Sequence, residues 1–141
     1  MSEIKVKEYI VLTDRMYTET DEWIKIDDDI AVIGITDYAQ KKLKDIVGIE
    51  LPEVGKSVEK GEVISVIESI KATADVYAPV SGEIVEVNEK LLDSPELMNN
   101  EPYGEGWIVK IKVKDKNELN KLLKPEEYAK KIEEREEEEK E

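Results

Sequence analysis

Most of the chain consists of short strand-forming runs interrupted by turn residues, and this pattern limits the folds open to it. The runs extend over residues 22–113, and the clearest of them is residues 107–113. There, alternate apolar residues share one face of a strand, while Lys110 and Lys112 lie on the other face. Short strands at fairly regular spacing are typical of a small sandwich or barrel. We therefore expect a mainly β domain.

Two hairpins are expected within this region. Residues 23–26 and 30–33 are strand-forming and flank three consecutive aspartates, a loop that can reverse the chain. Residues 62–67 and 75–78 form a second pair of β-rich arms. The residues between these arms are mostly small or polar and include Lys71. Lys71 is therefore expected at a hairpin tip.

Helices are expected at three places. Thr36 can cap a helix that extends to residue 47, where Gly48 would end it. Ser94, followed by a proline, predicts a short helix at residues 94–97. The pattern turns helical again beyond residue 117.

The end of the chain is dominated by charge. Residues 133–141 contain seven glutamates and two basic residues, a net charge of −5. Like charges in such a run repel one another, so we expect this segment to fray into solvent. We place the domain over residues 1–132, with its C-terminal helical segment, and treat residues 133–141 as an acidic tail.

Composition excludes several classes of function. The 141 residues include no cysteine and no histidine, so the chain lacks thiolate nucleophiles, the usual general base near neutral pH and the commonest transition-metal ligands. A conventional hydrolase or a metal site is therefore not expected. The formal net charge of −14 would repel nucleic acid and anionic membranes. No stretch approaches the roughly 20 apolar residues of a membrane span, and the first residues lack the apolar core of a secretory signal, so a cytoplasmic location is expected.

Lys71 has small neighbours, which leave its amine sterically open. An exposed lysine at a turn is ordinarily just solvated, so this position alone assigns no role. However, residues 68–84 closely resemble the lipoyl-lysine segment of glycine cleavage H-proteins. The resemblance continues in chain order through residues 17–19, 22–23, 32–40, 47–55, 88, 93–97, 99–100 and 102–107.

The resemblance implies a fold and a function. The fold would be a barrel-sandwich hybrid of the lipoyl and biotinyl type, with short flanking helices and a C-terminal helix. Lys71 would carry covalent lipoate, attached by a lipoate-attaching enzyme. On this arm the carrier would shuttle the aminomethyl group of glycine from a pyridoxal-phosphate glycine decarboxylase to a tetrahydrofolate-dependent aminomethyltransferase, and dihydrolipoamide dehydrogenase would reoxidise the arm. The chain itself would have no catalytic residue.

The resemblance also implies roles for other residues. Glu22 and Asp75 match positions of the family's cleft for the loaded arm, with Thr20 beside them as a hydroxyl partner. Glu68, Asp75 and Gly82 match positions associated with recognition by the attaching enzyme, although turn conformation alone can equally require a glycine at residue 82. Asp21 stands where a histidine is typical of the family. Its charge would either strengthen the attraction for a loaded amine or tune docking.

Other interpretations stay open from the sequence. H-like lipoate-binding carriers that serve sulfur oxidation would share the scaffold. A biotinyl carrier usually brackets its lysine with methionines, whereas Ile70 and Ala72 flank Lys71 here. A lipoyl domain of a 2-oxo acid dehydrogenase acyltransferase normally continues through flexible linkers into further domains. An unmodified interaction module or a carboxylate-pair enzyme is less favoured, because no carboxyl group stands out as an acid.

Overall fold

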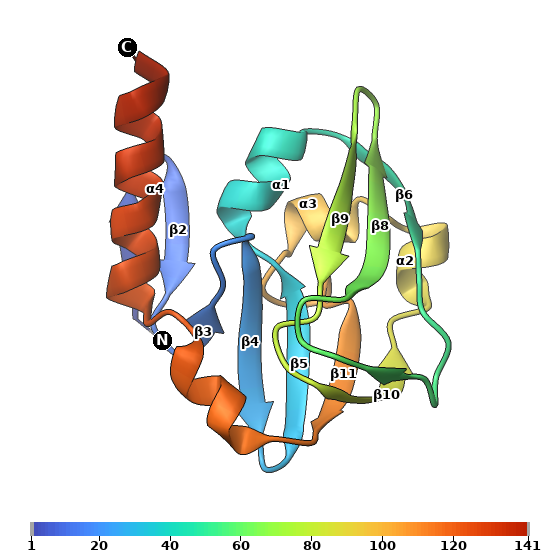
Figure 1. The fold of residues 1–141 in the computed structure, drawn as a ribbon. Helices are drawn as coiled ribbons and strands as arrows, with labels where there is room; N and C mark the ends of the chain where they lie inside the picture. Colours follow the sequence, from blue (N-terminus) through green and yellow to red (C-terminus); the bar gives the residue numbers. More distant parts are fainter. Residues whose placement is uncertain (1, 141) are drawn as a thin grey trace.

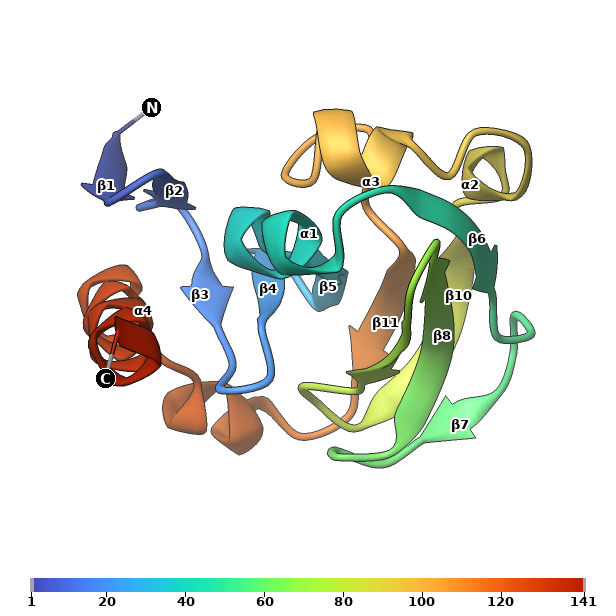
Figure 2. The same ribbon diagram turned by 90° about the horizontal axis from the view of Figure 1, so that it is seen from above.

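Three antiparallel sheets build the part of the chain described by the computed structural model, residues 2–140 (Figure 1; Figure 2). The strands are β1 Glu3–Val6, β2 Tyr9–Leu12, β3 Met16–Tyr17, β4 Glu22–Asp27, β5 Ile30–Ile35, β6 Ile46–Glu50, β7 Ser57–Val58, β8 Val63–Ser69, β9 Thr73–Tyr77, β10 Gly82–Val87 and β11 Val109–Val113. The helices are α1 Asp37–Leu43, α2 Lys90–Asp93, α3 Leu97–Asn100 and α4 Pro125–Lys140, with a 3-10 helix η1 at Lys116–Lys121.

The main core lies between the two larger sheets. One has the order β3-β4-β5-β11-β10-β7 and the other the order β6-β8-β9. Their apolar faces share one buried cluster that includes Ile33, Ile67, Ile84 and Ile111, each with no exposed surface. The alternation expected around Lys112 is confirmed, since that residue is exposed next to buried Ile111. The mainly β class is therefore confirmed.

A second core joins the C-terminal helix to the rest of the domain. Helix α4 runs along the β1-β2 hairpin, to one side of the larger sheets (Figure 1). Tyr9, Trp23, Tyr38, Tyr128 and Ile132 are all buried in this second cluster. Aromatic side chains bury large areas each, so this contact contributes substantially to holding the helix in place.

Both predicted hairpins form. Strands β4 and β5 pair from Glu22 with Ile35 to Asp27 with Ile30. Only two residues therefore lie in the turn, one fewer than expected, because Asp28 adopts a φ of 61° that closes a tighter turn. Strands β8 and β9 pair as far as Glu68 with Thr73.

Helix α1 is shorter than predicted. Thr36 caps its start as expected, its side chain accepting a hydrogen bond from the amide of Ala39, but the helix ends at Leu43 rather than residue 47. The side-chain amide of Asn99 donates to the Lys44 carbonyl at 2.7 Å, and its oxygen accepts from the Ile46 amide at 3.0 Å. A side chain from α3 thus satisfies the helix end and frees Ile46 to enter β6.

Two further predictions of helices need correction. The single helix expected at residues 94–97 is replaced by α2 and α3, and Ser94 ends α2 rather than capping a helix. Helix α4 continues to Lys140, so the fraying expected from residue 133 is not what the structure shows. Side chains beyond Ile132 contact the body of the domain, including Arg135 with Asp21 and Glu136 with Tyr9. Within residues 2–140, no helix is long and apolar enough to cross a membrane.

Candidate functional site

Lys71 lies at the tip of the β8-β9 hairpin, which projects beyond the sheets (Figure 1). Ser69 closes the tip: its amide donates to the Ala72 carbonyl at 2.8 Å, and its hydroxyl accepts from the Ala72 amide at 3.1 Å. The Ile70 amide donates to the Asp45 carbonyl at 3.1 Å, which ties the tip to the segment after α1. The root of the lysine is therefore held although the residue itself is exposed.

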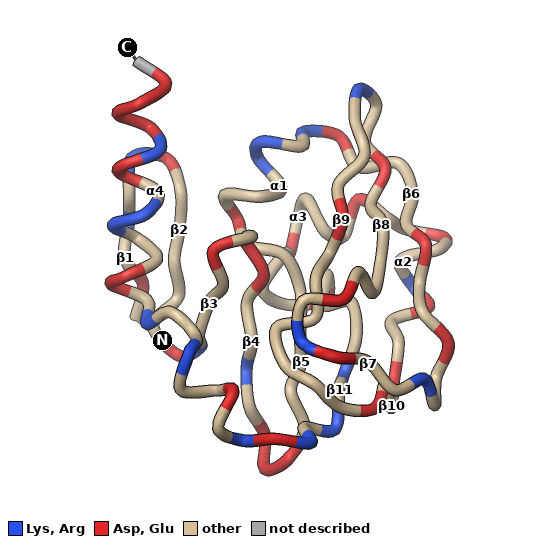
Figure 3. The backbone as a smooth tube through the Cα atoms, viewed as in Figure 1, with Lys and Arg blue, Asp and Glu red and all other residues tan. Residues whose placement is uncertain are grey.

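The surface around the tip is open. Ile70 is 68% exposed. Among the described residues, the amine of Lys71 forms no hydrogen bond or ion pair. The tip stands out as a positive point on a largely acidic or neutral hairpin (Figure 3). An amine in such a place is accessible to an enzyme that modifies it.

Glu68 and Asp75 lie on the same hairpin. Glu68 pairs with Thr73, and Asp75 pairs with Val66 two residues farther from the tip. Side chains two residues apart share a face of a strand, so the two acidic side chains lie on one exposed face. Neither of them lines the cleft described below.

Gly82 is located elsewhere, at the start of β10, near the end of the molecule opposite the tip (Figure 1). It is a glycine for a steric reason. A Cβ atom on this residue would lie 2.0 Å from the Lys112 carbonyl oxygen and 2.7 Å from Cγ2 of Ile111. Close approach of a neighbouring strand, rather than a turn conformation, therefore requires glycine here.

A cleft of about 410 Å³ opens between the Thr18–Glu22 turn and the far end of the β8-β9 hairpin. Thr18, Thr20 and Glu22 line one wall, and Lys60, Tyr77 and Lys121 are among the residues of the other walls. Of the three predicted cleft residues, the structure brings Thr20 and Glu22 together and leaves Asp75 outside the lining.

The carboxylate of Glu22 is buried, with 1% of the residue exposed. The hydroxyls of Thr18 and Thr20 each donate to its Oε1 at 2.5 Å, and the Tyr77 amide donates to Oε2 at 3.2 Å. Burial raises the pKa of Glu22 to about 7, against the opposing effect of these three donors. A carboxyl group with such a pKa changes charge near neutral pH, and its ionised form favours a cation beside it.

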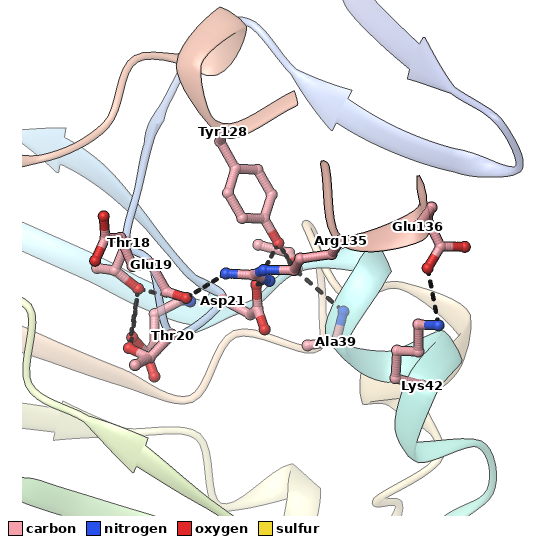
Figure 4. Close-up of polar contacts among 11 residues, drawn as sticks. Thr18, Glu19, Thr20, Asp21, Ala39, Lys42, Tyr128, Arg135 and Glu136 are labelled. Carbon is pink, nitrogen blue, oxygen red and sulfur yellow. Dashed lines mark hydrogen bonds and ion pairs between the residues drawn. The ribbon is translucent and has the colours of Figure 1, made fainter. Parts of the chain in front are cut away.

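Asp21 points away from the cleft and toward α4 (Figure 4). Its Oδ1 accepts hydrogen bonds from the Tyr128 hydroxyl at 2.9 Å and from Arg135 at 2.7 Å. The arginine thus compensates the charge of Asp21, which does not join Glu22 as a second ligand for a cation.

Sequence reasoning missed four residues of this region: Thr18, Tyr77, Tyr128 and Arg135. The spacing of Thr18, Thr20 and Glu22 was a signal that three polar side chains could gather at one turn. Tyr77 acts through its backbone, which carries no sequence signal. Arg135 is one of two basic residues in the acidic run, and only the fold reveals its partner.

Comparisons with known proteins agree with one another. The model of the family described as "Glycine cleavage H-protein" matches residues 15–135. The probable glycine cleavage system H protein 1 of Saccharolobus solfataricus is 63% identical over 94% of this chain and 98% of that protein. The probable glycine cleavage system H protein of Aeropyrum pernix is 60% identical over 92% of this chain and 90% of that protein.

A solved structure gives the same result for the fold. The crystal structure of a glycine cleavage system H protein from Mycobacterium marinum superposes with a TM-score of 0.78 at 38% identity, covering 86% of this chain and 98% of that chain. The predicted barrel-sandwich hybrid with flanking helices and a C-terminal helix is therefore confirmed.

Proposed function

The chain belongs to the glycine cleavage H-protein family, and from that premise we propose that Lys71 is the residue that carries its lipoyl group. The chain functions as the lipoyl carrier of a glycine cleavage system, a component that catalyses no reaction itself. When attached, the dithiolane supplies two sulfur atoms for group transfer, which a chain without cysteine does not have.

The accessible amine at a closed hairpin tip is the observation that carries this proposal. A carrier lysine must reach several enzymes, so it needs an exposed position on a rigid support. Lys71 has both, because its neighbours Ser69 and Ala72 hold the turn while its side chain is exposed.

The cleft beside Glu22 fits the free end of such an arm. Tyr77 lies four residue steps along β9 from Thr73, roughly 13 Å at the usual rise. A lysine with a lipoyl chain has roughly ten rotatable bonds and a reach on the order of 10 Å or more. We propose that Glu22, held by Thr20, accepts hydrogen bonds from a primary ammonium group that enters the cleft. Asp75, on the strand between the tip and Tyr77, would attract the cation on its way.

The partners form the next part of the proposal. As a component of a glycine cleavage system, the carrier would visit glycine decarboxylase, the aminomethyltransferase and dihydrolipoamide dehydrogenase in turn. A lipoate-attaching enzyme would recognise Glu68 and Asp75 on the exposed hairpin face. Gly82 would contribute through the shape of β10 rather than through contact at the tip. A cytoplasmic location is part of the same proposal, and cell fractionation tests it.

Intact mass tests the attachment site. Incubation with lipoate, ATP and a lipoate ligase is expected to add one lipoyl group to the wild type and none to Lys71→Arg. Lys44→Arg, which changes another exposed lysine, is the matched control and should be modified as the wild type is. Addition of a lipoyl group to Lys71→Arg would contradict the proposal.

Exchange of label between bicarbonate and glycine tests the client enzyme. The lipoylated wild type is expected to support this exchange when mixed with glycine decarboxylase, pyridoxal phosphate and glycine. The unmodified Lys71→Arg protein is expected to support none. A fully lipoylated carrier without exchange would point to a different lipoyl-dependent pathway.

A further inference from the structure

The C-terminal helix is attached directly to the turn that forms one wall of the cleft. The rings of Tyr17 and Tyr128 stack with centroids 4.6 Å apart and planes 3° apart. Tyr17 also exchanges two backbone hydrogen bonds with Leu123, at 2.9 and 2.8 Å. Helix α4 therefore begins against β3, immediately before the Thr18–Glu22 turn.

Asp21 is the point at which α4 holds this turn (Figure 4). Its φ of 73° lies in the left-handed region, which is disfavoured for a residue with a side chain and persists where surrounding contacts impose it. Two contacts to the side chain come from α4, because Tyr128 and Arg135 both donate to the Asp21 carboxylate, while the Thr36 amide donates to the Asp21 carbonyl at 3.1 Å. Arg135 donates in addition to the Glu19 carbonyl at 2.5 Å. One guanidinium thus spans two residues of the turn.

The same turn conformation positions the hydroxyls around Glu22. The Asp21 amide donates to the Thr18 carbonyl at 3.3 Å, and the Glu22 amide donates to the Thr18 hydroxyl at 3.0 Å. With the turn closed in this way, the hydroxyls of Thr18 and Thr20 reach one oxygen of the Glu22 carboxylate, Oε1. A different backbone angle at Asp21 would move Thr20 away from that oxygen.

We propose that Tyr128 and Arg135 are positioning residues that act through Asp21 to hold the Thr18–Glu22 turn in the conformation that engages Glu22 Oε1. In its functional meaning this inference rests on the proposed role of Glu22 in the cleft. Its geometry concerns the chain alone and needs no group on Lys71. The C-terminal helix is thereby part of the carrier site, although no side chain of α4 lines the cleft among the described residues.

Other contacts of α4 separate this role from simple attachment of the helix. Lys42 of α1 pairs with Glu136 at 3.0 Å and with Glu139 at 2.8 Å, two glutamates of α4 that do not contact the turn. These pairs secure α4 without touching Asp21 or Thr18. Lys42→Gln is therefore a matched control, since it weakens docking of the helix and leaves the turn contacts in place.

Several charged groups surround Glu22 and influence its titration. Glu19 and Asp21 belong to its own turn, Lys60 and Lys121 face the cleft from other walls, and Arg135 lies behind Asp21. Removal of Arg135 would leave the charge of Asp21 uncompensated, and loss of the threonine donors would remove groups that stabilise the ionised carboxylate. Both effects raise the pKa of Glu22.

The test uses unlipoylated full-length protein and NMR on Tyr128→Phe, Arg135→Gln, the double variant and Lys42→Gln. Amide exchange at Asp21 and Glu22 is expected to be at least about fivefold faster in the double variant, while exchange at Ile24 in β4 stays as in the wild type. The pKa of Glu22, followed through its carboxyl carbon, is expected to rise in Tyr128→Phe, Arg135→Gln and the double variant and to stay unchanged in Lys42→Gln.

Two results would overturn the inference. In the first, the turn amides of the double variant exchange at wild-type rates and Glu22 keeps its wild-type pKa. This would show that α4 does not position the turn. Equal acceleration of all amides, Ile24 included, would show a general stabilising role only. Failure of the attachment proposal would appear separately, as absence of a lipoyl group on Lys71, and would leave these measurements intact.

Discussion

Glu22 places a carboxyl group where its ionised form lacks the solvation of water. With a pKa of about 7 in the folded protein and 4.5 as its ordinary value, the folded state binds the proton more tightly than the unfolded chain. The protonated Glu22 carboxyl therefore makes its full contribution to the free energy of unfolding below about pH 4.5. This contribution, up to about 3 kcal/mol, is lost as the pH rises to about 7. The chain has no histidine, so few other groups titrate in this range.

We predict that Glu22→Gln removes this pH dependence. The glutamine oxygen can accept from the Tyr77 amide while its NH₂ group donates to the threonine hydroxyls, so the side chain still has partners. The free energy of unfolding of the variant should exceed that of the wild type at pH 8 by about 1–3 kcal/mol and converge with it at about pH 4. Urea denaturation at several pH values measures this, with exposed Glu68→Gln as control. If the free energy of unfolding of the wild type and of Glu22→Gln changes with pH in parallel, the prediction is wrong.

Gly82 gives a second prediction at the residue scale, because backbone of the next strand occupies the place of its missing side chain. Gly82→Ala is expected to lower the free energy of unfolding by about 2 kcal/mol or more, since the Lys112 carbonyl must move. Gly48→Ala is the matched control, because its added Cβ would meet nothing closer than 3.8 Å. The denaturation midpoints of the two variants test this prediction. Equal midpoints would mean that β10 and β11 can move apart with no loss in the free energy of unfolding.

At the scale of elements, the tip of the β8-β9 hairpin depends on one serine side chain. Ser69→Ala removes the acceptor of the Ala72 amide, so we expect exchange of that amide to become about fivefold faster, as loss of a hydrogen bond of about 1 kcal/mol implies. Amides of Ile67 and Val76, deeper in the hairpin, serve as the internal control. If the Ala72 amide exchanges at its wild-type rate, the backbone bond alone fixes the tip and the serine is dispensable.

Elements were predictable from sequence where local pattern and tertiary contacts agree. The hairpin at Lys71 has β-rich arms and small turn residues, and both features survive in the fold. The β1-β2 hairpin escaped notice because its two-residue turn, Lys7 and Glu8, has no typical turn residue, although Lys7 adopts a φ of 55°. The end of α1 could not be predicted either, since Asn99, more than fifty residues away, supplies the cap.

Sites followed the same rule. Lys71 and Glu22 were predicted from the resemblance of their surrounding residues, and Thr20 from its position beside Glu22, a contact that the structure shows. The environment of Asp21 was unpredictable, because its partners Tyr128 and Arg135 follow more than a hundred residues later. The end of α4 was also predicted wrongly, because the acidic run suggested repulsion and fraying. In the structure, Arg135 pairs with Asp21, and glutamates of the run pair with Lys42.

At the scale of the whole molecule, a net charge of −14 opposes compactness. Two like charges about 20 Å apart in water repel by about 0.2 kcal/mol, and an excess of this size creates dozens of such pairs. Against this stand exposed ion pairs, such as Lys7 with Glu137 and Lys90 with Glu105, each worth about 0–1 kcal/mol. The repulsion acts over longer distances than the pairs, so salt screens it more strongly.

We therefore predict that added sodium chloride raises the melting temperature. From about 0.01 M to about 0.15 M salt, the Debye length falls from about 30 Å to about 8 Å, which removes most repulsion across the domain and leaves contacts of 3–4 Å largely intact. The triple variant Glu133→Gln, Glu134→Gln and Glu138→Gln loses three exposed negative charges, for which the described residues provide no ion-pair partner. Its melting temperature should be higher at low salt and respond less to added salt. A wild-type melting temperature that falls over this range would mean that the ion pairs holding α4 outweigh the repulsion, and the variant would then gain nothing.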